Sequence, residues 1–255
     1  MVISTAPVGT FDWVAATGGH LSRDERRRLL RPLASTHAVN AVGRASMLIH
    51  LNSGRRVHID PSALALPTSP LTAAAEREAR ARLSPALLNH SYRTYAFGAA
   101  LGALANIDVD TELLFAAAML HDTGLRQLMR GADFTLASAR IARDVAEIVG
   151  LSTAATDTLS TAITMHHSPG VTPADGPVAY LLSAGAGVDV IGLRSWKLPP
   201  QVLAEVVAQR PRLGFKREFT AAWREEAAGV PRGRAQLLRR YGAFDLAIKL
   251  APFRS

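Results

Sequence analysis

The sequence predicts an all-α protein, a helical bundle preceded by a small N-terminal extension. From Leu71 onward, apolar residues recur at the three- and four-residue spacing of amphipathic helices. The alternation of apolar and polar residues that marks a strand is confined to residues 46–60. With 255 residues, 48% of them hydrophobic, the chain can bury one sizeable core. We therefore divide it into an extension, residues 1–62, and a helical domain, residues 63–255.

The composition limits the compartment and the kind of metal site. The chain has no cysteine, so disulfides and thiolate ligands are excluded, and a bound metal must be held by histidine and carboxylate groups. No run of about 18 uncharged apolar residues is present, and no basic segment followed by an apolar one opens the sequence. We expect a cytoplasmic protein that makes no membrane contact.

The net charge of +8 is concentrated towards the two ends of the sequence. A basic surface can indicate a nucleic-acid partner. The arginines of residues 210–240, however, are interleaved with glutamates along predicted helices, as on a solvated helix face, and no zinc-finger or RNP-type motif accompanies them. The pattern argues against a nucleic-acid partner, and formation of a homo-oligomer stays open.

The extension is predicted to contain a helix and a β-hairpin. Ser22 and Glu25 have the spacing of a capping box, which opens a basic helix that ends near Leu33. Residues 46–51 and 55–60 are predicted to form two short strands, because a turn sequence of Asn, Ser and Gly separates them.

Nine helices are predicted beyond a proline-punctuated linker at residues 61–70. Their boundaries follow from the apolar spacing and from capping and stop residues, of which Ser84-Pro85 is a clear helix start. The helices are expected at residues 71–82, 85–105, 111–122, 136–149, 153–167, 177–193, 200–209, 215–228 and 232–250.

One apolar helix ends in two hydrophilic residues. The run from Leu113 to Leu120 consists of good helix formers, follows a candidate N-cap at Asp110, and stops at His121-Asp122. A buried His and Asp are costly unless they are hydrogen-bonded, paired or bound to a metal. A His-Asp dipeptide alone is a weak motif, so this site needs partners from elsewhere in the chain.

Candidate partners lie on neighbouring predicted helices. His90 falls in the second turn of its helix on the inward face, His166 and His167 end another helix, and Asp189 lies between two valines of an apolar helix. Converging helices can bring such side chains onto one ion. Without a metal, the same residues would have to satisfy one another in a buried polar network.

Two histidines and two carboxylates make up the expected ligand set. These donors suit a borderline divalent ion such as iron, zinc or manganese. The set consists of His90, His121, Asp122 and Asp189. The remaining histidines stand apart and are assigned to no site, namely His20, His37, His50 and His58.

The order His, His-Asp, Asp across an all-helical region resembles the HD-domain superfamily of metal-dependent phosphohydrolases and hydrolases, over residues 71–195. More narrowly, LNHSYRTYAFG at residues 88–98 and LHDTGL at residues 120–125 resemble the cyanamide hydratase-like branch. The resemblance implies an HD-type helical bundle and an enzyme, a metal-dependent hydrolase or hydro-lyase.

Carried over residue by residue, the resemblance implies that the four ligands above bind the metal and that His166 lies near it. No histidine lies between His121 and His166, so the fuller histidine pattern of dinuclear relatives is incomplete, and one divalent ion is expected. Relatives of this branch often carry Phe-Glu after the His-Asp motif, whereas this chain has Phe134-Thr135. That departure from the pattern of the relatives argues against nitrile hydration.

The expected chemistry is attack by a metal-activated water on a small nitrile- or amide-like substrate. Asp122 is expected to orient or deprotonate the water, and His166 to act as a general acid. Arg93, three residues after His90, can reach a group bound at the metal, and a guanidinium there suits phosphate. Two alternatives therefore stay open: a nucleotide or phosphoester phosphohydrolase, and a non-catalytic metal- or ligand-binding regulatory module.

Overall fold

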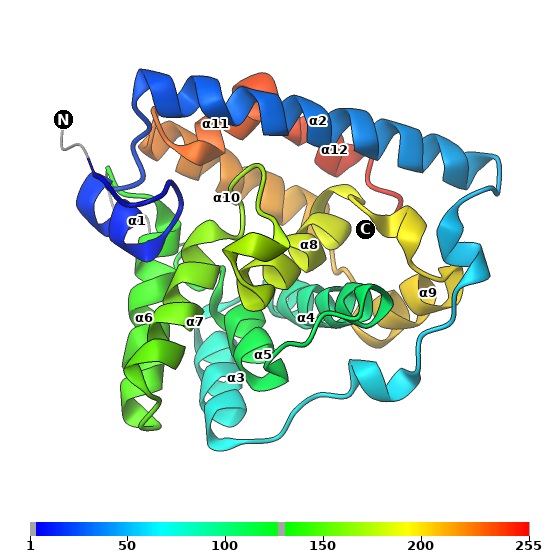
Figure 1. The fold of residues 1–255 in the computed structure, drawn as a ribbon, viewed down its shortest axis with the longest axis horizontal. Coiled ribbons are helices and arrows are strands. Elements are labelled where there is room, and N and C mark those ends of the chain that lie inside the picture. Colours follow the sequence, from blue (N-terminus) through cyan, green and yellow to red (C-terminus); the bar gives the residue numbers. More distant parts are fainter. Residues whose placement is uncertain (1–3, 127–130, 255) are drawn as a thin grey trace.

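The computed structural model describes residues 4–126 and 131–254, and within these ranges all regular secondary structure is helical (Figure 1). The described α-helices are α1 (Phe11–Thr17), α2 (Arg23–Leu48), α3 (Pro70–Arg82), α4 (Pro85–Ala105), α5 (Thr111–Leu120), α6 (Phe134–Ile148), α7 (Thr153–Met165), α8 (Pro177–Ile191), α9 (Pro200–Gln209), α10 (Phe215–Gly229), α11 (Arg234–Tyr241) and α12 (Phe244–Lys249). Four short 3-10 turns join them, η1 (Ser53–Arg56), η2 (Pro61–Leu64), η3 (Pro173–Asp175) and η4 (Ser195–Lys197). The all-α fold class is confirmed.

The nine helices predicted from residue 71 onward are present, with ends that differ by a few residues. Two predicted caps form: Ser84 Oγ accepts a hydrogen bond from Leu87 N at 3.3 Å, and Asp110 Oδ1 accepts one from Leu113 N at 3.0 Å. The last predicted helix is divided into α11 and α12, because Ala243 adopts a left-handed backbone conformation with φ 44°.

The predicted hairpin at residues 46–60 is wrong. The capping box at Ser22 forms as predicted, but the helix it opens continues to Leu48, and a 3-10 turn follows. Tertiary contact explains the difference: the side chain of Asn52 donates to the carbonyl of Trp196, and a Cβ at Gly54 would lie 2.1 Å from the carbonyl oxygen of Leu198. Asn52 and Gly54 therefore allow the backbone to pack closely against η4, where no side chain fits at Gly54. They do not form a turn between two strands.

The central core is built around the pair α4 and α8, which form the most extensive helix contact in the described structure. Glycines make this close approach possible. A Cβ at Gly185 of α8 would lie 2.1 Å from the carbonyl oxygen of Thr94 and 2.8 Å from the backbone nitrogen of Gly98, both on α4. α5 packs against both helices of this pair, and α7 packs against α8 and α5.

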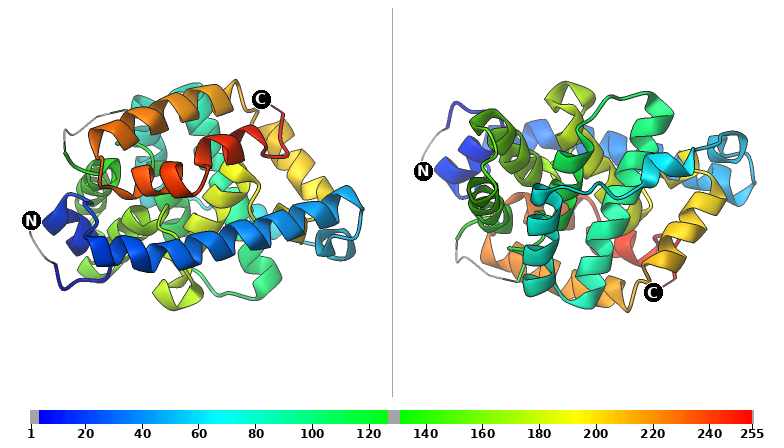
Figure 2. Two further views of the ribbon diagram at one scale, coloured as in Figure 1. Left: turned by 90° about the horizontal axis from the view of Figure 1, so that it is seen from above. Right: turned by 90° about the horizontal axis from the view of Figure 1, so that it is seen from below.

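The second layer combines the N- and C-terminal helices. α2 runs along one face of the molecule with α11 and α12 beside it (Figure 2). Leu33 of α2 belongs to the same buried cluster as Leu87 of α4 and Phe219 and Trp223 of α10. α2 is therefore packed directly against α4 and α10. In the described ranges, no helix is both long enough and apolar enough to cross a membrane.

The close approach of α4 and α8 predicts a sharp contrast between two glycines. Gly185→Ala should destabilise the fold by about 1–3 kcal/mol or more, because backbone atoms of α4 leave no space for a methyl group. Gly229→Ala, at the end of α10 where a Cβ meets nothing within 4 Å, should be neutral or stabilise by about 0.4–1 kcal/mol. Urea unfolding of both variants is the measurement; equal stabilities would contradict the predicted packing.

Candidate metal centre

The C-terminal ends of α5 and α7, the second turn of α4 and the last turn of α8 meet at one buried point. His121 caps the C-terminus of α5 and Asp122 follows it, and His166 caps the C-terminus of α7. His90 lies on α4 and Asp189 on α8, the helices that glycine brings into contact. All five side chains are buried.

Three of these residues bring one donor atom each to a common point. The Nε2 atoms of His90 and His121 lie 3.3 Å apart, and Asp122 Oδ2 lies 3.3 Å from Nε2 of His121 and 3.6 Å from Nε2 of His90. Ligands that share one ion at about 2 Å are themselves roughly 3 to 4 Å apart. His90, His121 and Asp122 therefore have the spacing of a metal-binding group.

The other ring nitrogen of each histidine is held by an acceptor. Nδ1 of His121 and Nδ1 of His166 each donate to the backbone carbonyl three residues earlier, both at 2.7 Å. Nδ1 of His90 donates to Asp189 Oδ2, also at 2.7 Å. Since carbonyl and carboxylate oxygens only accept, each Nδ1 carries the proton, and each neutral ring presents a lone pair at Nε2.

The donor atoms that converge here form an electron-rich group, and within the described structure no arginine or lysine pairs with Asp122. The lone pairs of His90 and His121 face each other and cannot hydrogen-bond while both rings are neutral. Neither oxygen of Asp122 has a hydrogen-bond partner within the described structure, although the residue is only 1% exposed. A buried carboxylate without a partner is costly, so a divalent cation fits the residues present.

Burial and neighbouring charge shift the pKa values of the centre in different directions. Burial alone would lower the pKa of His121, but the carboxylate of Asp122 beside it raises that pKa. Burial lowers the pKa of His90, and burial together with His121 and His167 holds the pKa of His166 well below its usual range, which keeps both rings neutral. Burial alone would raise the pKa of Asp122, but His121, His90 and His166 lower it, so its carboxylate is ionised.

Asp189 lies outside this group of three. Its Oδ1 accepts from Arg93 Nε at 2.8 Å and from Arg212 Nη1 at 2.5 Å, and its Oδ2 accepts from Arg93 Nη2 at 2.9 Å and from His90 Nδ1. Burial alone would raise the pKa of Asp189, but Arg93, His90 and Arg212 hold it well below its usual range. The carboxylate is on the Nδ1 side of His90, away from the Nε2 that faces Asp122.

Arg93 shares the face of His90, as its spacing predicts, but it is fully buried and does not line the cavity described below. Its fork holds Asp189, and its Nη1 donates to the carbonyls of Arg210 and Pro211 at 2.8 and 3.3 Å. The guanidinium is thus committed to protein acceptors.

His166 and His167 have different surroundings. Nε2 of His166 lies 3.7 Å from Asp122 Oδ1, next to the group of three. Nε2 of His167 lies 3.5 Å from Asp133 Oδ2, and its ring stacks on Phe134. Only His166 therefore directs a nitrogen to the metal centre.

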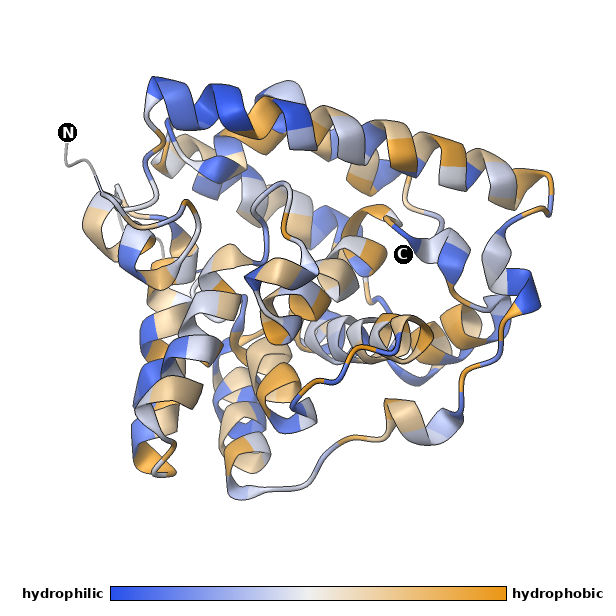
Figure 3. Ribbon diagram, in the orientation of Figure 1, coloured by the Kyte–Doolittle hydropathy of each residue, from blue (hydrophilic) through white to orange (hydrophobic). Residues whose placement is uncertain are grey.

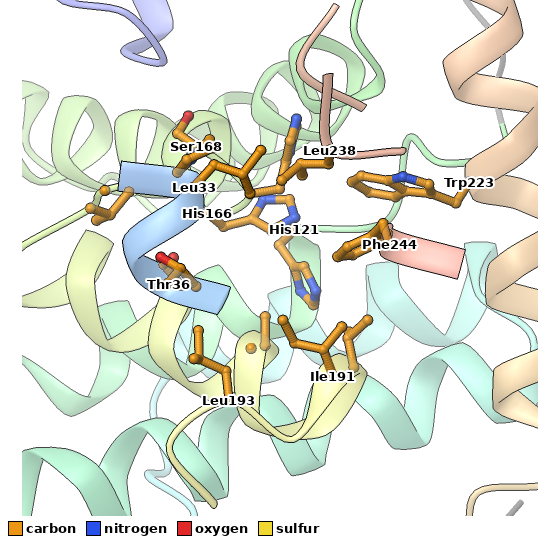
Figure 4. Close-up of a pocket in the computed structure, with 18 of the residues that line it drawn as sticks. Leu33, Thr36, His121, His166, Ser168, Ile191, Leu193, Trp223, Leu238 and Phe244 are labelled. Atoms are coloured by element: carbon orange, nitrogen blue, oxygen red, sulfur yellow. The ribbon is translucent and has the colours of Figure 1, made fainter. Parts of the chain in front are cut away.

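A cavity of about 140 Å³ opens beside the candidate metal centre. Figure 4 shows His121 and His166 between Leu33 and Thr36 of α2 on one side and Trp223 and Phe244 on the other. The metal-centre residues His90 and Asp122 line it as well. The rest of the wall is predominantly apolar and includes Val190, Ile191, Leu193, Phe219 and Leu238.

A second buried polar cluster lies behind His167. Asp133 Oδ2 accepts from Arg234 Nη2 at 2.8 Å, and its Oδ1 accepts from the hydroxyl of Thr135 at 2.7 Å. Glu226 of α10 is 2% exposed and accepts from the backbone nitrogen of Phe134 at 3.2 Å. Burial, together with the negative charge of Asp133, raises the pKa of Glu226 to about 8.

Sequence reasoning missed several residues of the site. His37 lines the cavity from α2, although its place in the sequence sets it apart from the ligand histidines. Arg212 and the aromatic residues Phe219 and Trp223 come from the C-terminal region, where apolar spacing predicts a helix but not its position. No local signal could have found them, because they reach the site only through the packing of α10 and the loop before it.

A helical bundle with a buried histidine–aspartate centre is one of the architectures in which proteins place metal ions. Residues 87–209 match the family model described as the HD domain. The match supports assignment of this helical region to the HD-domain superfamily, whose members are generally metal-dependent hydrolases. It spans α4 to α9 and contains all five residues that meet at the centre. No curated protein matches the chain.

Glu226 makes stability depend on pH in a defined direction. Its ordinary pKa of 4.5 applies to the unfolded chain, whereas the folded protein keeps the acid protonated up to about pH 8. Stability should therefore fall as the pH rises from 5 to 8, by on the order of 3 kcal/mol from this group. Glu226→Gln, which keeps the acceptor but cannot ionise, should show a flatter stability profile. Parallel profiles from urea unfolding would contradict the assignment.

Proposed function

We propose that the protein is a metal-dependent HD-domain hydrolase or hydratase that adds water to a small, largely apolar, uncharged substrate of nitrile or amide type. The observation that carries the proposal is the convergence of three imidazole lone pairs on the unpartnered carboxylate of Asp122 beside an apolar cavity. Donors in this arrangement fit one ion of iron, zinc or manganese. Resemblance of residues 88–98 and 120–125 to the cyanamide hydratase-like branch supports this substrate class.

In this proposal His90, His121 and Asp122 hold the ion. When bound, the ion supplies Lewis acidity and lowers the pKa of water at the site towards neutrality. The chain's own contribution is to fix the ligands: the Nδ1 hydrogen bonds determine which nitrogen of each histidine faces the centre. Three protein ligands leave positions open for water and substrate.

Asp189 acts, in this proposal, on the metal through His90 and not as a ligand. Both of its oxygens are occupied by arginine and histidine donors, so ligation would break hydrogen bonds to two buried guanidinium groups. A carboxylate on the far nitrogen of a ligating histidine orients the ring and raises its basicity. This role departs from the direct ligation that the sequence resemblance implies.

His166 is the residue that we propose handles the proton. Its Nδ1 proton is held by a backbone carbonyl, so its Nε2 lone pair, 3.7 Å from Asp122, is available to accept a proton at the centre. The same nitrogen can then return that proton to the leaving or developing anion. Asp122 orients the attacking water in this scheme.

The cavity favours a small uncharged substrate over a nucleotide. A space of about 140 Å³ is comparable to a cavity that holds benzene, and its walls are mostly aliphatic and aromatic. Phosphate oxygens require fixed cations. Arg194 is the one arginine or lysine among the cavity's described lining residues, and its guanidinium lies over the ring of Tyr180. That single residue keeps phosphoester hydrolysis as the second candidate.

His121→Ala should remove most of the metal bound by protein purified without chelators and should lower the melting temperature, because the ion links α4 and α5. His58→Ala, at an exposed position away from the centre, should change neither quantity. Metal content by mass spectrometry and thermal unfolding are the measurements. Retention of full metal content by His121→Ala would rule out the ligand set, and metal-free parent protein would favour a regulatory binding module.

Asp189→Asn tests the indirect role separately. It should weaken metal affinity about 10- to 100-fold while leaving a measurable site, as expected for loss of an orienting carboxylate. Complete loss of metal, equal to that of Asp122→Ala, would instead identify Asp189 as a ligand.

Arg93 distinguishes the two candidate substrates. If it braces Asp189, Arg93→Lys should weaken metal binding and stability, because a point charge cannot replace the bidentate fork, and inorganic phosphate should not inhibit the parent protein. Metal titration and activity screens on nitriles, amides and phosphoesters provide the comparison. Unchanged metal binding together with loss of phosphate inhibition in the variant would favour the phosphohydrolase.

A further inference from the structure

The outer face of α2 is apolar along its C-terminal half. Between residues 32 and 43 the helix carries no charged residue, and its exposed positions are occupied by alanine, valine and one serine; the exposed Leu48 and Ile49 follow at its C-terminal end. The largest side chains are well exposed, with Val42 at 72%, Ile49 at 64% and Leu48 at 83%. Figure 3 shows the change along α2 from a hydrophilic N-terminal end to a more hydrophobic C-terminal end. Exposed apolar patches of this kind mark interaction surfaces.

The outward residues have the spacing of a helix-pairing seam. Successive steps of four, three, four, three and four residues connect a single line of side chains along the helix. An average step of 3.5 residues keeps one face towards a partner helix over several turns. The seam consists of Arg31, Ser35, Ala38, Val42, Ala45 and Ile49.

The opposite face of α2 already holds the helix on the molecule. Leu33 packs into the cluster around Trp223, and Gly43 lies against Trp196, where a Cβ would come within 2.0 Å of the indole. Arg44 donates to the carbonyl of Leu250, the residue that follows α12. The seam is therefore a fixed, continuous surface and is not needed for the contacts that attach α2 to the rest of the fold.

We propose that this seam pairs with the seam of a second copy of the chain, antiparallel and about a twofold axis near Asn40. In this register Ala38 faces Val42 of the other copy, a small residue against a larger one, and Ser35 faces Ala45 of the other copy. A twofold axis makes each contact occur twice, so one self-complementary surface is sufficient. The small residues allow the two helices to approach closely along the middle of the seam.

Charge complementarity selects the antiparallel arrangement. The last turn of α2 contains no basic residue, so the negative end of its helix dipole is not compensated within the helix. Arg31 is exposed, and its side chain makes no hydrogen bond or ion pair with any part of the chain that the structure describes. The register places Arg31 beside Ile49 at the C-terminal end of α2 in the other copy. There the aliphatic part of the arginine side chain packs on the isoleucine, and the guanidinium interacts favourably with the negative end of the helix dipole. A parallel pair would place the two arginines together.

The surface has a suitable extent for a dimer. The seam from Arg31 to Ile49 is about 27 Å long at the rise of an α-helix. Val39 and Leu48 flank it, and Leu246 of the neighbouring α12 and Leu250 just after that helix are also exposed. Together they can approach the roughly 800 Å² per partner of a standard interface, which a single helix face would not reach.

The pairing has a consequence for the cavity. Leu33 and Thr36 of α2 line the cavity on the inner side of the helix whose outer side forms the seam. A second helix packed along α2 would hold this wall of the cavity in place. The pairing does not depend on metal, so its failure would leave the proposed function untouched.

Cysteine cross-linking of the full-length chain tests the register directly, because the natural sequence contains no cysteine. Under mild oxidation, a mixture of the Ser35→Cys and Ala45→Cys proteins should form the mixed disulfide dimer. Each variant alone should remain largely uncross-linked, since its two thiols would lie about 15 Å apart along the axis. Efficient homodisulfides of either variant alone, or no mixed product, would overturn the antiparallel pairing.

Light scattering after size-exclusion chromatography tests the pairing without added thiols. The parent protein should have the mass of two chains at micromolar concentration, and Val42→Glu should halve that mass while circular dichroism stays helical. Ile148→Glu is the matched control, since Ile148 is 77% exposed on α6, away from the seam, and should leave the mass unchanged. A monomeric parent protein would overturn the proposal, as would a parent that stays monomeric and binds anionic phospholipid vesicles through Val42.

Discussion

The site depends first on where three histidine protons are held. His90, His121 and His166 each donate through Nδ1 to an acceptor 2.7 Å away, so each ring directs its Nε2 lone pair inward. Two of the acceptors are backbone carbonyls of the helices that carry the histidines, which ties ring orientation to helix geometry. The helix ends of α5 and α7 must therefore be placed correctly before any donor set can form around Asp122.

Charge balance imposes the second requirement. Two ionised carboxylates, Asp122 and Asp189, are buried close together, and the two buried arginines Arg93 and Arg212 both contact Asp189. This distribution leaves Asp122 without a partner and neutralises its neighbour, which is the arrangement expected if a cation belongs beside Asp122 alone. Arg212 lies in the loop just before α10. The placement of the C-terminal helices therefore also determines the charge balance of the centre.

The sequence-based prediction and the structure differ most at α2 and the turn that follows it. The residues of 46–60 alternate as in a strand, yet a helix with a complete capping box propagates through the first of them, and contact with η4 determines the rest. Helix propagation is cooperative, whereas a two-stranded hairpin is marginal without packing for one of its faces. α2 consequently contributes both Leu33 and His37 to the wall of the cavity. A helix that ended near residue 33 would not carry His37.

The sequence by itself determined the helical class and the nine helices from residue 71 onward, because apolar spacing and capping are local. It also indicated His90 and His121-Asp122 as candidate site residues, because a buried His-Asp pair is costly wherever it lies. Only the tertiary structure decided which donors converge. Whether Asp189 faces the centre or two arginines depends on residues about a hundred positions away in one direction and about twenty in the other, Arg93 and Arg212. Spacing along one helix carries no information about such partners, since the packing of α4, α8 and the loop before α10 brings them together.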